Sequence, residues 1–134
     1  MRSLLAAAAV VIAPFAATAQ AVAEDASLAA VLVYADWCGS CQTLDPKVNA
    51  VKDAGVDGVE FVTLDYTAKD AEAFYAAADE AGVDGAVRAW LGETVKTGQL
   101  LLVDLDDARV IGKVDKTMSE AEIAGALKAA AAAA

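Results

Sequence analysis

Histidine is absent from the 134 residues of this chain, and cysteine and proline occur only twice each. Without an imidazole, the chain cannot build a Ser-His-Asp or Cys-His nucleophile pair, a histidine-containing zinc site or a histidine pH switch. Any chemistry must therefore come from cysteine, carboxylate, hydroxyl or backbone groups.

Basic residues are also scarce. The 10 Lys and Arg are outnumbered by 20 Asp and Glu, and the formal net charge is −10. The basic residues are scattered along the chain, whereas a surface that binds phosphate backbones needs them clustered. The sequence therefore predicts no nucleic-acid partner, and the acidic excess favours solubility. The length fits a single domain.

The first segment of the chain is apolar but short. Arg2 is followed by an apolar stretch over residues 4–17 and then by small residues. This stretch is shorter than the roughly 20 residues that span a bilayer, and the pattern is typical of a cleaved secretory signal over residues 1–23. Cleavage after Ala19 and cleavage after Ala23 both fit, and an uncleaved anchor is the alternative.

The exported product is expected to be one domain over residues 24–134. No later segment is long and apolar enough to cross a bilayer, so we expect no stable membrane insertion after cleavage. We expect a monomer in the bacterial periplasm. In such an oxidising compartment a cysteine pair can cycle or lock as a disulfide.

Strand and helix patterns alternate in the first half of this domain. Residues 31–35 form a continuous β-branched and aromatic run, typical of a strand buried on both faces. A helix that contains Pro46 and ends at Gly55 follows, then a strand over residues 59–65 and a second helix ending at Gly82. The predicted inner residues of the first helix are Cys41, Leu44, Val48 and Val51, and those of the second are Ala71, Phe74, Tyr75 and Ala78.

The second half predicts a hairpin and a last helix. Residues 83–98 are predicted mostly as loop, with one short helical candidate at 86–91. Residues 100–105 and 109–114 read as two strands joined by a tight turn, which makes an antiparallel hairpin. The final helix has overlapping capping boxes and an Ala-rich end that we expect to fray. The boxes are Thr117 with Glu120 and Ser119 with Glu122, and the inward residues are Ile123 and Leu127.

The sharpest chemical signal is a pair of cysteines, Cys38 and Cys41, where the first strand gives way to a helix. At a helix N-terminus the free backbone N–H groups stabilise a thiolate, with a pKa of about 3.5–7.5. Cys38 is therefore the predicted attacking sulfur. Cys41 begins the buried stripe and is placed to resolve a mixed disulfide, while Gly39 and Ser40 permit the tight turn.

The segment Tyr34-Ala-Asp-Trp-Cys-Gly-Ser-Cys41, with Pro46 five residues further on, resembles the thioredoxin family. The resemblance covers roughly residues 27–128. The residues of this segment are most similar to those in the C-terminal domain of the thiol:disulfide interchange protein DsbD. The resemblance implies an α/β thioredoxin-like fold, with a mixed central sheet of about four strands flanked by three or four helices.

The same resemblance implies a thiol:disulfide oxidoreductase that acts on protein thiols and disulfides, with the reductase direction favoured. Cys38 would be the nucleophile and Cys41 the resolving thiol. A membrane-bound reductant is the candidate partner that resets the pair, and neither a metal nor a cofactor beyond the thiols is implied. The implied substrate-docking residues are Trp37, Gly39, Ser40, Thr97 and Gly98.

The chain departs from the family pattern at two places. The family's buried Asp, six residues before the first cysteine, is Leu32 here, so the proton acceptor is unassigned. Asp36 is the nearest carboxylate in sequence and the candidate acceptor, although a solvated loop acid is an equal reading. The family's cis-proline is replaced by Gly98. Since a cis bond without proline costs about 2.5–4 kcal/mol, we expect a trans peptide and a remodelled groove.

Two alternatives to catalysis stay open at this point. The pair could be a structural disulfide, although so small a loop contributes little chain entropy. It could also belong to a thioredoxin-fold binding or metal-carrier module without turnover, because two thiolates suit Cu(I).

Overall fold

The computed structural model describes residues 26–134, so the predicted signal segment and its cleavage sites lie outside the described residues. The sheet has four strands in the order β2-β1-β3-β4. They are β1 (Leu28–Tyr34), β2 (Val59–Asp65), β3 (Gln99–Asp104) and β4 (Arg109–Val114). β1 pairs parallel with β2 and antiparallel with β3, and β4 pairs antiparallel with β3, so the sheet is mixed as predicted.

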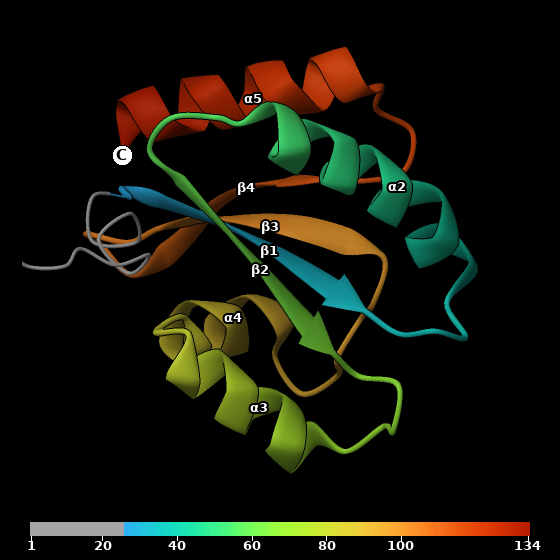
Figure 1. Ribbon diagram of the computed structural model, residues 1–134. Coiled ribbons are helices and arrows are strands. Elements are labelled where there is room, and N and C mark those ends of the chain that lie inside the picture. Colours follow the sequence, from blue (N-terminus) through green and yellow to red (C-terminus); the bar gives the residue numbers. More distant parts are fainter. Residues whose placement is uncertain (1–25) are drawn as a thin grey trace, which may run out of the picture.

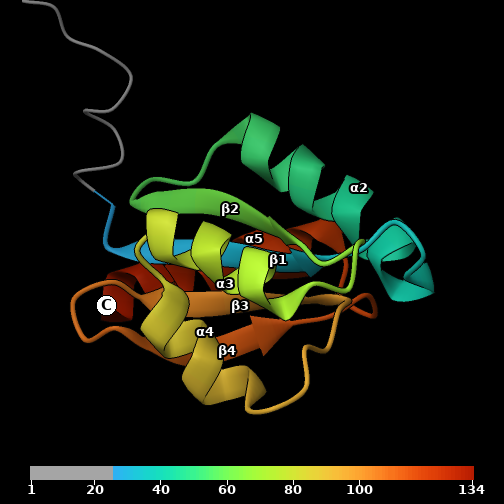
Figure 2. The same ribbon diagram turned by 90° about the horizontal axis from the view of Figure 1, so that it is seen from below.

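Two helices cover each face of the sheet, as can be followed in Figures 1 and 2. On one face lie α2 (Gly39–Ala54) and α5 (Glu120–Ala133), and on the other lie α3 (Ala71–Glu80) and α4 (Asp84–Leu91). The central strand β1 therefore contributes to two cores, because successive side chains point to opposite faces. Leu28, Ala30 and Leu32 pack toward α2 and α5, whereas Ala29, Val31 and Val33 pack toward α3 and α4.

The helix that carries the cysteine pair matches its predicted inner stripe. Cys41, Leu44, Val48 and Val51 are the buried residues of α2, Pro46 lies within it, and Gly55 caps its end. The N-cap is Cys38, with extended backbone. The chain therefore passes from the carboxyl end of β1 through a short turn into a helix that has a cysteine at its N-terminus, where the first N–H groups have no partner within the helix.

Several predicted details need correction. Residues 83–98 are not mostly loop, because α4 spans Asp84–Leu91 and buries Ala86, Val87 and Leu91. Its N-cap, Val83, makes no side-chain cap hydrogen bond, which explains the weak signal in the sequence. Ala71 is exposed rather than inward, while Phe74, Tyr75 and Ala78 are buried as predicted.

Further corrections concern the strand ends and the last helix. The first strand starts earlier, at Leu28, and the third is shifted by one residue, to Gln99–Asp104. Of the two capping boxes only that of Ser119 with Glu122 forms. Thr117 instead bonds Asp115. The predicted frayed end is helical to Ala133, because alanine is the best helix former and Ser27 Oγ donates to the Ala131 carbonyl at 3.3 Å.

Candidate functional site

The two cysteines are free thiols that lie at the start of α2. Cys38 is buried except for 8% of its surface, and Cys41 is fully buried. The Cys41 backbone N–H donates to Cys38 Sγ at 3.2 Å, so Cys38 uses its sulfur as the cap of the helix. Cys41 Sγ in turn donates to the Val33 carbonyl at 3.6 Å. The sequence pattern could not predict this last contact, because it identifies Val33 only as a core side chain and the acceptor is its backbone carbonyl.

The surroundings shift the pKa values of the two thiols in opposite directions. Burial raises the pKa of the Cys38 thiol, but donors from Cys41, the Thr97 hydroxyl and the Ser40 backbone outweigh burial and hold this pKa below its ordinary value. Burial, the hydrogen bond to Cys38 and the charge of Cys38 raise the pKa of Cys41 to about 11. At neutral pH the structure therefore favours a thiolate at Cys38 and a protonated thiol at Cys41.

This difference predicts two separate alkylation profiles. In the reduced protein, Cys38 should react with iodoacetamide with a midpoint below pH 9, the ordinary thiol value, because its thiolate is stabilised. Cys41 should stay unmodified until the pH approaches 11. Peptide mass spectrometry after timed alkylation across pH 5–11 measures both profiles, with the unfolded protein as control. Equal midpoints for the two folded thiols would contradict the assignment.

The loop before β3 closes the site against the cysteines. The Gly98 N–H donates to the Val33 carbonyl at 2.8 Å, and its φ of +91° is a conformation that favours glycine. A Cβ at this position would lie 2.8 Å from Ser40 Cβ and 3.3 Å from Cys38 Sγ. The structure thus brings Thr97, Gly98, Ser40 and both thiols together. The described residues contain no cis peptide, which agrees with the trans peptide expected at Gly98.

Trp37 lies beside the thiols at the surface, with 49% of its area exposed. Its Nε1 donates to the Thr67 carbonyl at 2.9 Å, and its ring meets Tyr66 edge-on with centroids 6.5 Å apart. The Lys69 ammonium lies 5.0 Å from the ring centroid. The sequence pattern singled out Trp37 but not the segment from Tyr66 to Lys69, which supports it from the end of β2.

Asp36, the candidate proton acceptor, is exposed. Its main chain anchors the turn, because its N–H donates to Thr67 Oγ1 at 3.0 Å and its carbonyl accepts from Gln42 Nε2 at 3.1 Å. Among the described residues, the groups that shift the pKa of Cys41 do not include the Asp36 carboxylate. The structure therefore holds Asp36 next to the pair in sequence without a contact to the buried thiol.

The comparisons with known proteins address the family. The family model described as Thioredoxin matches residues 10–83, which is more than half of the chain. This chain belongs to the thioredoxin family. Its thioredoxin-like fold is also seen among solved structures, of which 26 chains match. A thioredoxin mutant from Halobacterium salinarum NRC-1 is 20% identical with a TM-score of 0.51, and the match covers 84% of this chain and 81% of that one.

A second similar structure is the thioredoxin of Fasciola hepatica, at 20% identity and a TM-score of 0.49, covering 82% of this chain and 88% of that chain. No curated protein matches this chain. The family assignment supports thiol-disulfide chemistry in general, whereas the likeness to DsbD in particular is not confirmed by these matches.

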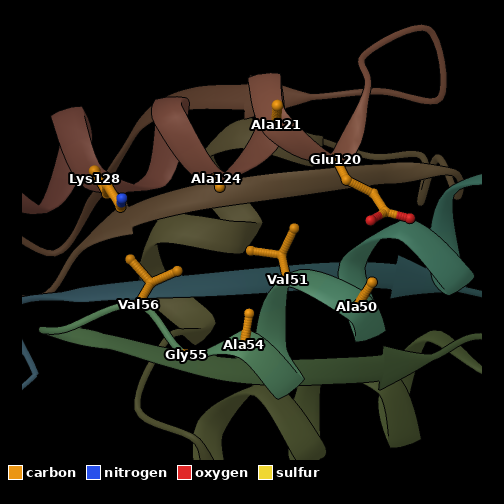
Figure 3. A pocket seen from close by; sticks show the side chains of 9 residues that line it. All are labelled: Ala50, Val51, Ala54, Gly55, Val56, Glu120, Ala121, Ala124 and Lys128. Atoms are coloured by element: carbon orange, nitrogen blue, oxygen red, sulfur yellow. The ribbon is translucent and has the colours of Figure 1, made fainter.

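This thioredoxin-family chain also has a hollow remote from its cysteines. A cavity of about 460 Å³ lies between the end of α2 and the face of α5 (Figure 3). Its walls combine small and apolar side chains, alanine being the commonest, with the charged Glu120 and Lys128 on α5. Because it begins at Ala50, near the opposite end of α2 from Cys38, it contributes no group to the thiol site.

Proposed function

We propose that this chain is an exported thiol:disulfide oxidoreductase that exchanges a Cys38–Cys41 dithiol for the disulfide of a protein partner, in the reductase direction. One observation carries the proposal: two adjacent thiols have opposite pKa shifts, lowered at Cys38 and raised to about 11 at Cys41. An attacking thiol must be ionised, and a resolving thiol must stay protonated until the mixed disulfide has formed. This pair meets both requirements.

The exchange proceeds in two displacements. Cys38 thiolate attacks one sulfur of the partner disulfide, a Cys38–partner bond forms, and the second partner sulfur leaves as a thiolate that takes up a proton. Cys41 then loses its proton and attacks Cys38 Sγ, and the first partner sulfur is released as a thiol. The partner thus gains two electrons from the pair and two protons, one from Cys41 and one from solvent. A dithiol reductant, for which we propose a membrane-bound protein, returns the pair to the reduced state.

The surroundings of Cys38 support a docking role for the predicted residues. Trp37 is exposed beside the pair, Gly39 and Ser40 form the first turn of α2, and Gly98 lies against Ser40. We assign substrate docking to these residues and Thr97. We keep Asp36 as the candidate proton acceptor, acting through solvent since its carboxylate does not contact Cys41.

Turnover is tested by the reduction of insulin with dithiothreitol as the electron source. The reduced protein should accelerate precipitation of the insulin B chain over dithiothreitol alone. A rate equal to the uncatalysed control would contradict the proposal. The protein should also be analysed for copper and zinc, because one metal per chain that is lost in the Cys38→Ser/Cys41→Ser variant would support the metal-carrier alternative. The described residues contain no group of three or more His, Cys, Asp or Glu arranged for a metal.

Export to the periplasm rests on the sequence of residues 1–23. In the described part of the chain, none of the helices has the length and apolar character required to cross a membrane. The mature protein from a bacterial periplasmic extract should begin at Gln20 or Glu24 by intact-mass spectrometry. A chain that still begins at Met1 would contradict cleavage. The relation to the DsbD C-terminal domain is part of this proposal, and it rests on the sequence of the Tyr34–Cys41 segment.

A further inference from the structure

One backbone oxygen joins the docking loop to the buried thiol. The Val33 carbonyl accepts the Gly98 N–H at 2.8 Å and the Cys41 thiol at 3.6 Å. Val33 and Cys41 are fully buried, and Gly98 is buried as well. Water therefore does not replace either donor readily, and a change at one donor is felt by the other through the shared acceptor.

The donor at position 98 depends on the residue found there. Proline has no N–H, so a proline at this position could not bind the Val33 carbonyl. Glycine supplies the N–H, accepts a φ of +91° and leaves room for Ser40, whose Cβ would be only 2.8 Å from a Cβ at position 98. The departure from the family pattern at Gly98 thus adds a hydrogen bond that a proline cannot make.

The second donor exists only in one oxidation state. A carbonyl oxygen has two lone pairs and can accept two donors, but each donor weakens the other's bond. Cys41 carries a single S–H while the pair is reduced, within hydrogen-bonding reach of both the Val33 carbonyl and Cys38 Sγ. It loses this hydrogen when the Cys38–Cys41 bond forms. In the oxidised protein the Gly98 N–H no longer shares the carbonyl with the thiol.

We propose that the Val33 carbonyl couples the Thr97–Gly98 loop to the redox state of the cysteine pair, with Gly98 as a positioning residue for Cys41. The inference rests on the proposed exchange function. When the reduced pair passes two electrons to a partner disulfide, an S–S bond forms here and the partner's S–S bond breaks, while the partner sulfurs take up one proton from Cys41 and one from solvent. The Gly98 hydrogen bond then shortens, and the loop is held more tightly.

The coupling is reciprocal. A hydrogen bond that is stronger in the oxidised state stabilises the disulfide relative to the dithiol, so removing the Gly98 N–H should favour the dithiol. Other groups also act on the Cys41 sulfur, among them a hydrogen bond from the Ala35 backbone. Cys38 is the titratable group that acts on it, the Thr97 hydroxyl contributes a hydrogen bond, and Tyr34 packs against the cluster of Ala35 and the two thiols.

The wild-type protein allows a direct test by NMR. The through-hydrogen-bond coupling between the Gly98 nitrogen and the Val33 carbonyl carbon should increase when diamide oxidises the pair. Diamide makes this measurement independent of exchange with a protein partner. The bond from the Tyr66 N–H to the Tyr34 carbonyl, 2.7 Å long and on the next residue of the strand, is the matched control and should not change. A coupling at Gly98 that stays constant or decreases would overturn the inference.

A backbone variant tests the effect on the redox equilibrium. Glycolic acid in place of Gly98, introduced by semisynthesis, removes the N–H and adds no side chain. Because the variant loses a hydrogen bond that stabilises the disulfide, the dithiol–disulfide equilibrium in glutathione buffers should shift about threefold toward the dithiol. The same ester at Gly112, in strand β4, is the control and should leave the equilibrium unchanged.

The two possible failures are distinguishable. An ester variant with the wild-type equilibrium constant would overturn the role of Gly98. A wild-type protein that reaches no equilibrium with glutathione would contradict the proposed function, and the diamide experiment would still decide the inference. The same NMR experiment decides it if the ester variant does not fold.

Discussion

Replacing Cys38 with serine should reduce insulin reduction to the uncatalysed background. The hydroxyl that replaces the thiol cannot form the thiolate that attacks a disulfide. The first displacement is therefore lost and no mixed disulfide forms, although the helix keeps a cap, since serine is a good N-cap residue. The measurement is the rate of insulin reduction together with the free energy of unfolding, which should stay near that of the wild type.

Cys41→Ser is the matched variant. It retains the attacking thiolate but has no resolving thiol. It should therefore accumulate a mixed disulfide with the partner, which excess dithiothreitol reduces. Non-reducing gel electrophoresis detects this complex. If Cys38→Ser kept full activity while Cys41→Ser lost it, the two roles would be reversed.

Leu32→Asp should destabilise the fold strongly at neutral pH. Leu32 is 1% exposed and packs in the apolar layer under α2 and α5 with Leu44 and Leu100. An unpaired carboxylate there should cost at least about 3 kcal/mol of the free energy of unfolding. The substitution would restore the family's residue at this position, but the buried cluster that contains Leu32 is apolar.

The stability of the Leu32→Asp variant should also depend on pH, in a direction that the shift in pKa determines. Burial raises the folded-state pKa of the new carboxyl above its unfolded value of about 3.9. Below this unfolded value the group is protonated in both states. As the pH rises above it, the unfolded chain releases its proton first, so stability falls with rising pH. Leu32→Asn, which cannot ionise, should lack this dependence. Denaturant unfolding between pH 3 and pH 8 compares the two variants, and a Leu32→Asp protein as stable as wild type at pH 7 would show that the site solvates a carboxylate.

The elements with strong periodic patterns could be predicted from the sequence. Residues 59–65 and 109–114 match β2 and β4, and the four inner residues of α2 are all buried. These elements bury one consistent face, so their patterns reflect their packing. Helix α4 could not be placed with the same clarity, because it is short, lacks a side-chain cap and lies among glycines.

The candidate site shows a similar division. Cys38 and Cys41 could be identified from their spacing at the strand-to-helix junction, and the structure places Thr97 and Gly98 beside them. The acceptor at Val33 could not be identified, because a backbone carbonyl leaves no trace in a side-chain pattern. The support of Trp37 by Thr67 was also hidden, since it depends on where β2 ends relative to β1.

The most direct test of the central claim is the redox equilibrium of the Cys38–Cys41 pair. The purified protein is equilibrated in glutathione buffers, its free thiols are trapped by alkylation, and the fraction with two thiols is measured by mass spectrometry. We predict a reversible two-thiol transition, with a potential nearer that of thioredoxin, about −270 mV, than that of the oxidant DsbA, about −120 mV. A pair that stays fully oxidised or fully reduced in every buffer would contradict catalysis of exchange.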